Sequence, residues 1–474
     1  MAHAQIRVMS PSWLITDLGD KGRIQGSTTT LGAPFYGDRV LGRLVWGPST
    51  TDQAYCTAED YKVPPPLTGK REGSEYEEVR LINIVLIQRG KCSFATKVAV
   101  AYEKGAHAVI IYDKDESTLK REDMQNVIVQ EDGFATDIHI PSVFVSKEDG
   151  SKLLSAAKSS QVIVELAWDV PAHDVVTADL WMSSGADDSQ QFLKEFAPRR
   201  RVLNEVVMFQ PHYAVYAMDG LKVEGSGVKN SQMCSDETYR FCVEDPDGEG
   251  PITGQMVIHE DVRQLCIHEV YKVLRAPREG SGPSSAVEYS AQFWNYVERL
   301  PDRCPLLARN QKDIIEGKSF GDKCSELLMT ELGIDLDKVH YCVTRTTAEK
   351  LQHEREHTAW SSRALRINGW RYSGILDAEL VTRAICAGFI TQPAECETLL
   401  NPRDPFAAFI PQRQAAGISY LQLFLWLGSC LALMWCAIVC YRRYLSDKMR
   451  STLREEVMLE VQAQMGEYSQ MTCK

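Results

Sequence analysis

The chain has 474 residues, which is enough for two or three domains of ordinary size. Hydrophobic residues make up 44% of it and charged residues 24%, proportions that are typical of a folded protein. The formal net charge is -12 and no long basic patch occurs, so the composition argues against a nucleic-acid partner.

Residues 1–172 are expected to form a domain with a mixed α/β core. Apolar runs at 83–88 and 108–112 predict buried strands, and the spacing between them predicts a helix over 92–104 that Gly105 ends. The next elements should be a strand, a helix and a strand, at 141–146, 147–158 and 161–167. Strands that alternate with helices in this way are typical of an α/β domain.

Residues 173–396 are expected to form a second α/β domain that contains a disulfide-rich helical insertion at about 234–350. The elements predicted outside the insertion are a strand at 176–182, a helix near 190–196, a strand near 212–218, a hairpin at 364–374 and a helix at 378–388. Residues 397–417 contain three prolines and should form a short stalk.

The segment 418–440 contains 23 residues and no charged side chain. At about 1.5 Å per residue, a helix of this length spans a bilayer core of roughly 30 Å, so we predict a transmembrane helix rather than a buried core helix. Basic residues are concentrated directly after it, at Arg442, Arg443, Lys448, Arg450 and Arg454. The positive-inside rule then makes 441–474 a cytosolic tail and 1–417 a lumenal region, which is a type I topology.

The cysteines agree with this topology. Ten of the fourteen precede the apolar segment, and an even set in a lumenal region predicts disulfides rather than reduced thiols. Residues 1–17, however, lack the basic and apolar regions of a signal peptide. A tail-anchored protein with its bulk in the cytosol is therefore the alternative topology, and the cysteines disfavour it.

Several motifs resemble those of plant-type vacuolar sorting receptors. The first domain is similar to the protease-associated (PA) domain of that family at LGAPFYGDRVLGRLVW (31–46), QRGKCSF (88–94), EDGF (131–134) and IPS (140–142). The central region is similar at FQPHY (209–213), RFCVEDPD (240–247), WNYV (294–297), RCP (303–305), ELGID (331–335) and AICAGF (384–389). The order and approximate spacing of these motifs also match those of the family.

The resemblance implies a fold and a function for each domain. The central region of the family looks like a thioredoxin-type fold with a helical insertion, and its PA domain binds a short sorting peptide on soluble cargo. Carried over, a disulfide between Cys56 and Cys92 would hold the binding loop. The EGF-type repeats of the family are not carried over, because only about twenty residues separate Cys396 from the apolar segment. The cargo-binding residues would be Arg89, Gly90, Lys91, Cys92, Ser93 and Phe94.

The chemistry of Arg89 suits this role. An arginine can donate forked hydrogen bonds to peptide carbonyl groups or to a carboxylate, and N–H groups at the start of the following helix add further donors. The alternative is that Arg89 pairs with a nearby acidic residue and only fixes the shape of the loop.

Two patterns raise enzymatic alternatives. Thiol–disulfide exchange requires Cys-x-x-Cys at the start of the first helix of a thioredoxin-type fold, and residues 181–191 contain no cysteine. Residues 353–357 read HEREH, in which His353 and His357 could bind zinc while Glu354 acts as general base. Because the pattern and its flanks are charged and polar, we favour a solvated helix, with no catalytic residue, metal or cofactor. A membrane-anchored zinc metallopeptidase is the alternative.

The tail carries a short signal near its end. Tyr468 and Met471 fit Tyr-x-x-Φ, a pattern that clathrin adaptors bind as an extended strand, and the resembling family carries a tyrosine signal in its tail. We therefore expect a receptor that sorts soluble vacuolar or lysosomal precursors between the Golgi, the endosome or prevacuolar compartment, and the vacuole. A folding factor that binds clients through the thioredoxin-like domain is a further alternative.

Overall fold

The computed structural model divides into two units, Met1–Pro411 and Gln412–Lys474, and each is described by itself. The EDGF motif at 131–134 lies outside the described residues. The structure describes residues 3–47, 55–57, 59, 62–69, 79–127, 129, 138–218, 232–235, 238–248, 250–275, 286–407, 409 and 420–471.

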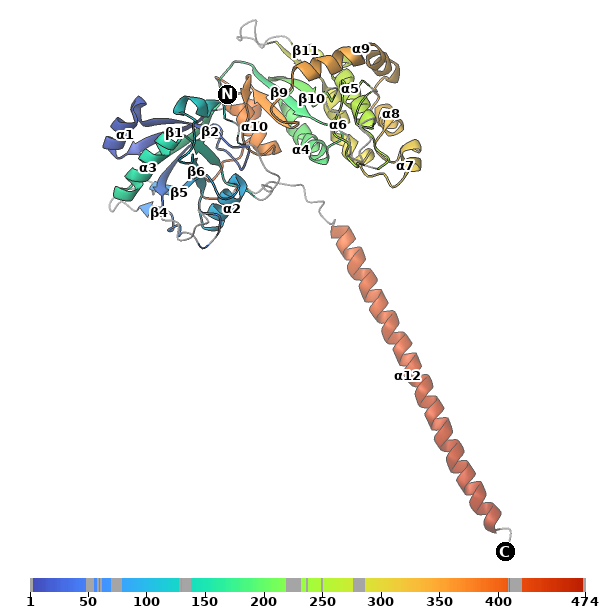
Figure 1. The fold of residues 1–474 in the computed structure, drawn as a ribbon. Coiled ribbons are helices and arrows are strands. Elements are labelled where there is room, and N and C mark those ends of the chain that lie inside the picture. Colours follow the sequence, from blue (N-terminus) through green and yellow to red (C-terminus); the bar gives the residue numbers. More distant parts are fainter. Residues whose placement is uncertain are drawn as a thin grey trace. The chain divides into compact units, whose positions relative to one another are not determined.

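A mixed sheet of eight strands organises the first domain (Figure 1). Its order is β3-β8-β1-β2-β7-β6-β5-β4, and a further pairing of β3 with β5 closes seven of the strands into a ring. Strands β5, β6 and β7 are parallel to one another, whereas β1 pairs antiparallel with both of its neighbours. The strands are β1 (His3–Ser10), β2 (Arg23–Thr28), β3 (Arg39–Val45), β4 (Leu67–Gly69), β5 (Val79–Gln88), β6 (Ala108–Tyr112), β7 (Ser142–Val145) and β8 (Ile163–Asp169).

Helices cover this sheet on two faces, because successive residues of the central strands point to opposite sides. In β6, Val109 and Ile111 belong to the apolar cluster that packs against α2 (Phe94–Glu103). Their neighbour Ile110 belongs to the other cluster, which includes residues of α1 and α3. The remaining helices of the domain are α1 (Ser12–Leu18), η1 (Asp20–Gly22), η2 (Arg121–Gln125) and α3 (Lys147–Ser159). This arrangement confirms the mixed α/β core.

A second sheet, of order β10-β9-β13-β14, organises the second domain. Strands β9 and β10 are parallel, and β13 runs antiparallel to β9. The predicted second strand was misplaced at 212–218: β10 spans Val207–Tyr213 and includes Pro211, which an edge strand tolerates. The other elements are β9 (Val176–Met182), α4 (Asp187–Leu203), β13 (Ala364–Ile367), β14 (Trp370–Arg371), α10 (Ala378–Ala387) and α11 (Ala394–Leu399).

The insertion between β10 and β13 is mainly helical, and Figure 1 shows its helices grouped beside β9 and β10. It contains α5 (Gly254–Val270), β11 (Val273–Arg275), β12 (Val287–Tyr289), α6 (Ala291–Arg303), α7 (Gln311–Ile315), α8 (Asp322–Glu331) and α9 (Leu336–Glu356). Its disulfides are Cys234–Cys242, Cys266–Cys342 and Cys304–Cys324, and Cys386–Cys396 follows it. The bond from Cys266 to Cys342 joins α5 to α9.

The segment predicted as a stalk, 397–417, differs in its first half, which packs on the first domain. The guanidinium of Arg403 donates to the carbonyl oxygens of Ala33 (2.8 Å) and Pro34 (2.7 Å), and it lies 4.0 Å from the ring centroid of Phe35. The sequence did not predict these contacts, because Arg403 lies about 370 residues from Ala33 and Pro34.

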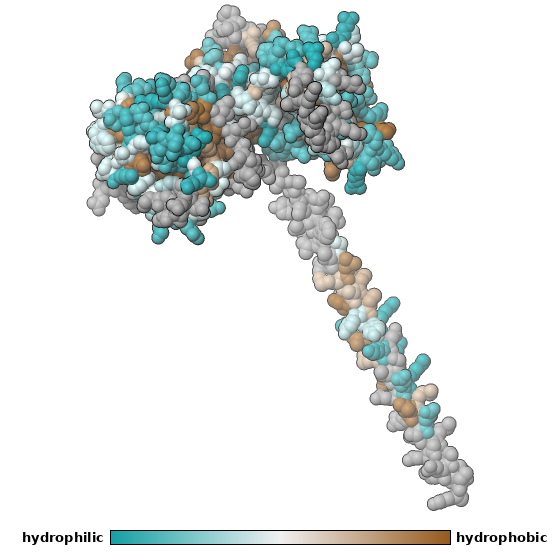
Figure 2. All heavy atoms as spheres, viewed as in Figure 1, coloured by the Kyte–Doolittle hydropathy of each residue, from teal (hydrophilic) through white to brown (hydrophobic). Residues whose placement is uncertain are grey.

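The second unit contains one helix, α12 (Tyr420–Met471), within the described residues. On the coloured part of this helix in Figure 2, hydrophobic atoms prevail at first, and hydrophilic and hydrophobic atoms are mixed further along. Large apolar side chains there are exposed, for example Leu433 and Trp435, each at 71%. Within the part of the chain that the structure describes, no helix combines the length and the apolar character that a membrane span requires. Of the predicted span 418–440, residues 418 and 419 and the side chains of 420–427, 430 and 431 lie outside the described part of the chain.

Candidate functional site

The candidate cargo-binding loop, 89–94, lies at the carboxyl ends of the parallel strands β5 and β6. The N–H of Arg89 donates to the carbonyl oxygen of Tyr112 at 2.8 Å, which extends the pairing of the two strands by one residue. The chain then turns through Gly90 (φ 124°) and Lys91 (φ 69°), in the region that favours glycine. Ligands of α/β sheets commonly bind beyond the carboxyl ends of parallel strands, so the position suits a binding loop.

The second half of the loop is held by a disulfide and by a helix cap. Cys92 is bonded to Cys56, with the two Cα atoms 5.9 Å apart. The Oγ of Ser93 accepts a hydrogen bond from the N–H of Thr96 at 3.1 Å, which makes Ser93 the N-cap of α2. This cap explains why the helix begins at Phe94, two residues later than apolar spacing predicted. The loop is therefore fixed on both sides.

Arg89 forms an ion pair with an acidic residue, as expected if it fixes the shape of the loop. Its Nη1 lies 3.2 Å from Oδ1 of Asp113, which is fully buried and also accepts a hydrogen bond from Ser117. The guanidinium lies 5.6 Å from the ring centroids of Phe94 and Phe144, within cation–π range. The side chain is still 40% exposed, and a guanidinium has five N–H donors. These contacts therefore orient Arg89 and leave part of it accessible to a ligand.

The HEREH pattern is not assembled as a zinc-hydrolase site. His357 caps the end of α9, and its Nδ1 lies 2.8 Å from the carbonyl oxygen of His353. Glu354 is 2% exposed, accepts a hydrogen bond from the N–H of Tyr213 at 2.9 Å, and lies 3.2 Å from Nδ1 of His212. The prediction of a solvated helix is therefore wrong for Glu354, because β10 buries it from 141 residues away in the sequence.

The segment that would hold the redox cysteines in a thioredoxin-type enzyme instead contacts the helical insertion in this chain. Directly after β9, the N–H of Ser184 donates to Oδ1 of Asp261 in α5 at 3.0 Å, and the side chain of Gln190 donates to the carbonyl oxygen of Ser184 at 2.7 Å. Burial raises the pKa of Asp261 to about 8. Because 181–191 contains no thiol, this segment cannot perform thiol–disulfide exchange.

A cavity of about 400 Å³ lies at the opposite end of α2 from the candidate loop. Its lining includes Tyr102 and His107 of the first domain, and Arg403 and Phe406 from the segment predicted as a stalk. No local pattern in the sequence predicts it, since its walls come from distant segments.

The proposed tail signal lies in the last turns of α12, where Tyr468 and Met471 are helical. The side chains of both residues lie outside the described part of the chain.

Comparisons with known proteins support the two domains. The family model of the vacuolar sorting receptor thioredoxin-like domain matches residues 176–386, and that of the PA domain matches 40–153. Vacuolar-sorting receptor 7 of Arabidopsis thaliana is 27% identical over 408 residues, or 79% of this chain and 58% of that protein. Vacuolar-sorting receptor 1 of Pisum sativum is 26% identical over 407 residues, or 79% of this chain and 59% of that protein.

A shorter match has a different name. The probable leucine aminopeptidase 2 of Aspergillus fumigatus is 27% identical over 192 residues, which are 40% of this chain and 31% of that protein. The receptors match about twice as much of the chain, although the chain spans less than two thirds of their length. The chain therefore has a PA domain followed by a thioredoxin-like domain of the vacuolar sorting receptor type, and over most of its length it is similar to vacuolar-sorting receptors.

Proposed function

We propose that the protein is a cargo-sorting receptor that binds soluble vacuolar or lysosomal precursors through the loop 89–94. The observation that carries this proposal is the geometry of Arg89. Its guanidinium is oriented by Asp113 and two aromatic rings, yet its side chain is 40% exposed at the carboxyl ends of parallel strands. An oriented arginine loses little conformational entropy when it binds a peptide carbonyl group or carboxylate.

The receptor performs no chemistry in this proposal. The thioredoxin-like domain has no cysteine at 181–191, and the HEREH pattern uses Glu354 to contact β10 rather than to face His357. The peptidase alternative requires Glu354 as a general base beside a zinc ion held by His353 and His357. That arrangement has no support in the described contacts of these residues.

We also propose a membrane anchor and a trafficking route for the protein. The charge-free segment 418–440 and the basic residues after it support a type I protein with a cytosolic tail. The tail would present Tyr468 and Met471 to a clathrin adaptor, which requires the end of α12 to become extended. The protein would then cycle between the Golgi, endosomal or prevacuolar membranes, and the vacuole.

Cargo capture tests the function. The full chain, solubilised from membranes with its disulfides intact, is incubated with the secretory-pathway lumenal contents of the same cells. Retention of vacuolar hydrolase precursors is the expected result. If the chain retains none and instead cleaves peptides in a zinc-dependent manner, the peptidase alternative replaces the receptor.

Adaptor recognition has its own test. A Tyr468→Ala variant should lose binding to the cargo-binding subunit of a clathrin adaptor, whereas Tyr444→Ala, in the same tail, should keep it. Equal adaptor binding by the wild type, Tyr468→Ala and Tyr444→Ala would show that Tyr468 is not the tail signal. That result would not bear on the cargo site.

A further inference from the structure

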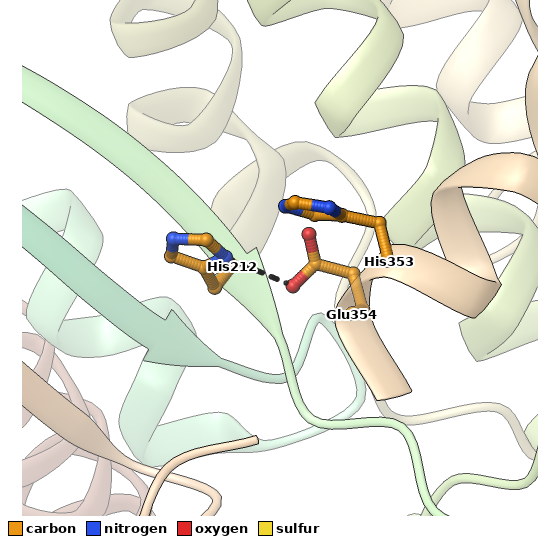
Figure 3. A group of neighbouring side chains, drawn as sticks. All are labelled: His212, His353 and Glu354. Atoms are coloured by element: carbon orange, nitrogen blue, oxygen red, sulfur yellow. Dashed lines mark hydrogen bonds and ion pairs between the residues drawn. The ribbon is translucent and has the colours of Figure 1, made fainter. Parts of the chain in front are cut away.

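Three potential metal ligands meet where the helical insertion returns to the thioredoxin-like sheet. His212 belongs to β10, and His353 and Glu354 belong to the last turns of α9. One ligand atom from each residue lies within 4.8 Å of the other two. Figure 3 shows the carboxylate of Glu354 between the two imidazole rings.

The cluster is buried on one side and open on the other. His212 is 7% exposed and Glu354 is 2% exposed, whereas His353 is exposed. A carboxylate beside two imidazoles in a partly desolvated position is a strong cation site, because water is a weak competitor there. An ion could still enter from the side of His353.

Neighbouring groups hold the ligands in place. Trp181 stacks on the ring of His212 with centroids 4.5 Å apart and an interplanar angle of 11°. The ring of His357 stacks on that of His353 at 4.0 Å. The N–H of Tyr213 donates to Glu354 at 2.9 Å. Supporting contacts of this kind orient the ligands in protein metal sites.

The donor set selects the kind of ion. Calcium and magnesium prefer sets of oxygen ligands, whereas two imidazoles with one carboxylate suit zinc. The ligand atoms of a tetrahedral zinc ion lie about 3.4 Å apart, so small side-chain rotations bring these three atoms into position. We propose that His212, His353 and Glu354 bind one Zn²⁺ ion, with water in the remaining position.

This site differs from the zinc-hydrolase pattern in its ligands and in its role. Glu354 is a ligand here and not a base, and His357 supports the ring of His353 without binding the ion. Since the ligands come from β10 and α9, a bound ion links the end of the insertion to the sheet. We assign the ion this linking role, at a place separate from the loop 89–94.

Zinc titration of the purified full chain tests the site, after the protein has been treated with a chelator and dialysed. Isothermal titration with Zn²⁺ should give one ion per chain, and saturating Zn²⁺ should raise the Tm by several degrees. Co²⁺ in place of Zn²⁺ should give the visible absorption of a tetrahedral site. His212→Ala and His353→Ala should each weaken Zn²⁺ binding at least tenfold.

Two histidines serve as controls, His340 within α9 and His357 at its C-cap. His340→Ala removes an imidazole that is 46% exposed and pairs with Glu326, and it should leave the Zn²⁺ affinity unchanged. His357→Ala should keep one ion per chain. Because His353 is exposed, His353→Ala should fold normally, and circular dichroism checks this. Absence of stoichiometric binding to the wild type, or loss of binding in His357→Ala but not in His212→Ala, would overturn the proposal.

Discussion

The hydroxyl group of Tyr36 makes two hydrogen bonds to the backbone of Ser373, one in each direction. It donates to the carbonyl oxygen at 3.1 Å and accepts from the N–H at 2.8 Å. The ring of Tyr36 also stacks on that of Tyr372, with centroids 5.3 Å apart. All three residues are buried, and Tyr36 and Tyr372 belong to one apolar cluster that extends through both domains. The PA domain and the thioredoxin-like domain are therefore packed together as one unit.

Removal of this hydroxyl group should weaken the unit. Tyr36→Phe keeps the stacked ring and deletes both hydrogen bonds, so we expect the free energy of unfolding to fall by about 1–3 kcal/mol. Urea unfolding monitored by tryptophan fluorescence measures the loss. Tyr341→Phe is the control, because Tyr341 is 63% exposed on α9. An equal free energy of unfolding for wild type and Tyr36→Phe would show that the contact contributes nothing.

Two glycines after β13 should respond differently to the same substitution. Both have positive φ, 107° for Gly374 and 76° for Gly369, so alanine strains the backbone at each. A Cβ at Gly374 would lie 2.4 Å from Cδ of Pro34, whereas a Cβ at Gly369 meets nothing within 4 Å. Gly374→Ala should therefore destabilise the protein by about 1–3 kcal/mol more than Gly369→Ala. Thermal unfolding of both variants checks this, and equal Tm values would contradict the close approach to Pro34.

Asp261 should make the stability of the protein depend on pH. Its folded-state pKa, raised by burial to about 8, lies above the value of about 3.9 in an unfolded chain. Between these two pKa values the folded state therefore holds a proton that the unfolded state has released. The stability that this proton contributes is complete below about pH 4 and is lost as the pH rises through about 8. Asp261→Asn cannot titrate, so its stability relative to wild type should increase between pH 5 and pH 8.

Urea unfolding at pH 5, 6.5 and 8 measures this difference, whose slope cannot exceed about 1.4 kcal/mol per pH unit for one proton. Asp302→Asn serves as a control at an exposed carboxylate. A constant difference between Asp261→Asn and wild type from pH 5 to 8 would show that Asp261 is ionised in the folded protein.

Local sequence patterns predicted the elements whose own residues show the hydrophobic spacing of a strand or a helix. The run AVIIY at 108–112 coincides with β6, and the helix predicted at 147–158 is α3 with one more residue. The start of α2 was predicted two residues early, because the side chain of Ser93 caps the helix and the helical residues begin at Phe94. The motif resemblance predicted both domains, and the comparisons confirm it.

Long-range contacts were outside the reach of these patterns. Arg403 was assigned to a stalk, since nothing near it in the sequence shows that it binds the backbone of Ala33 and Pro34. Glu354 was assigned to a solvated face, because the residues around it in the sequence are charged and do not indicate its contact with Tyr213. Burial of a charged residue depends on partners that only the tertiary fold supplies, and both errors have this cause.

The most direct test of the receptor is the affinity of the full chain for a peptide that carries a cargo sorting signal, compared between Arg89→Ala and Arg39→Ala. Arg39 is a surface arginine of β3 that is 58% exposed and paired with Glu165. Loss of a charge-assisted hydrogen bond of about 1.5–3 kcal/mol predicts a Kd increase of about 10- to 150-fold for Arg89→Ala and no change for Arg39→Ala. An unchanged Kd for Arg89→Ala, with the peptide bound by wild type, would contradict the assignment of the cargo site to this loop.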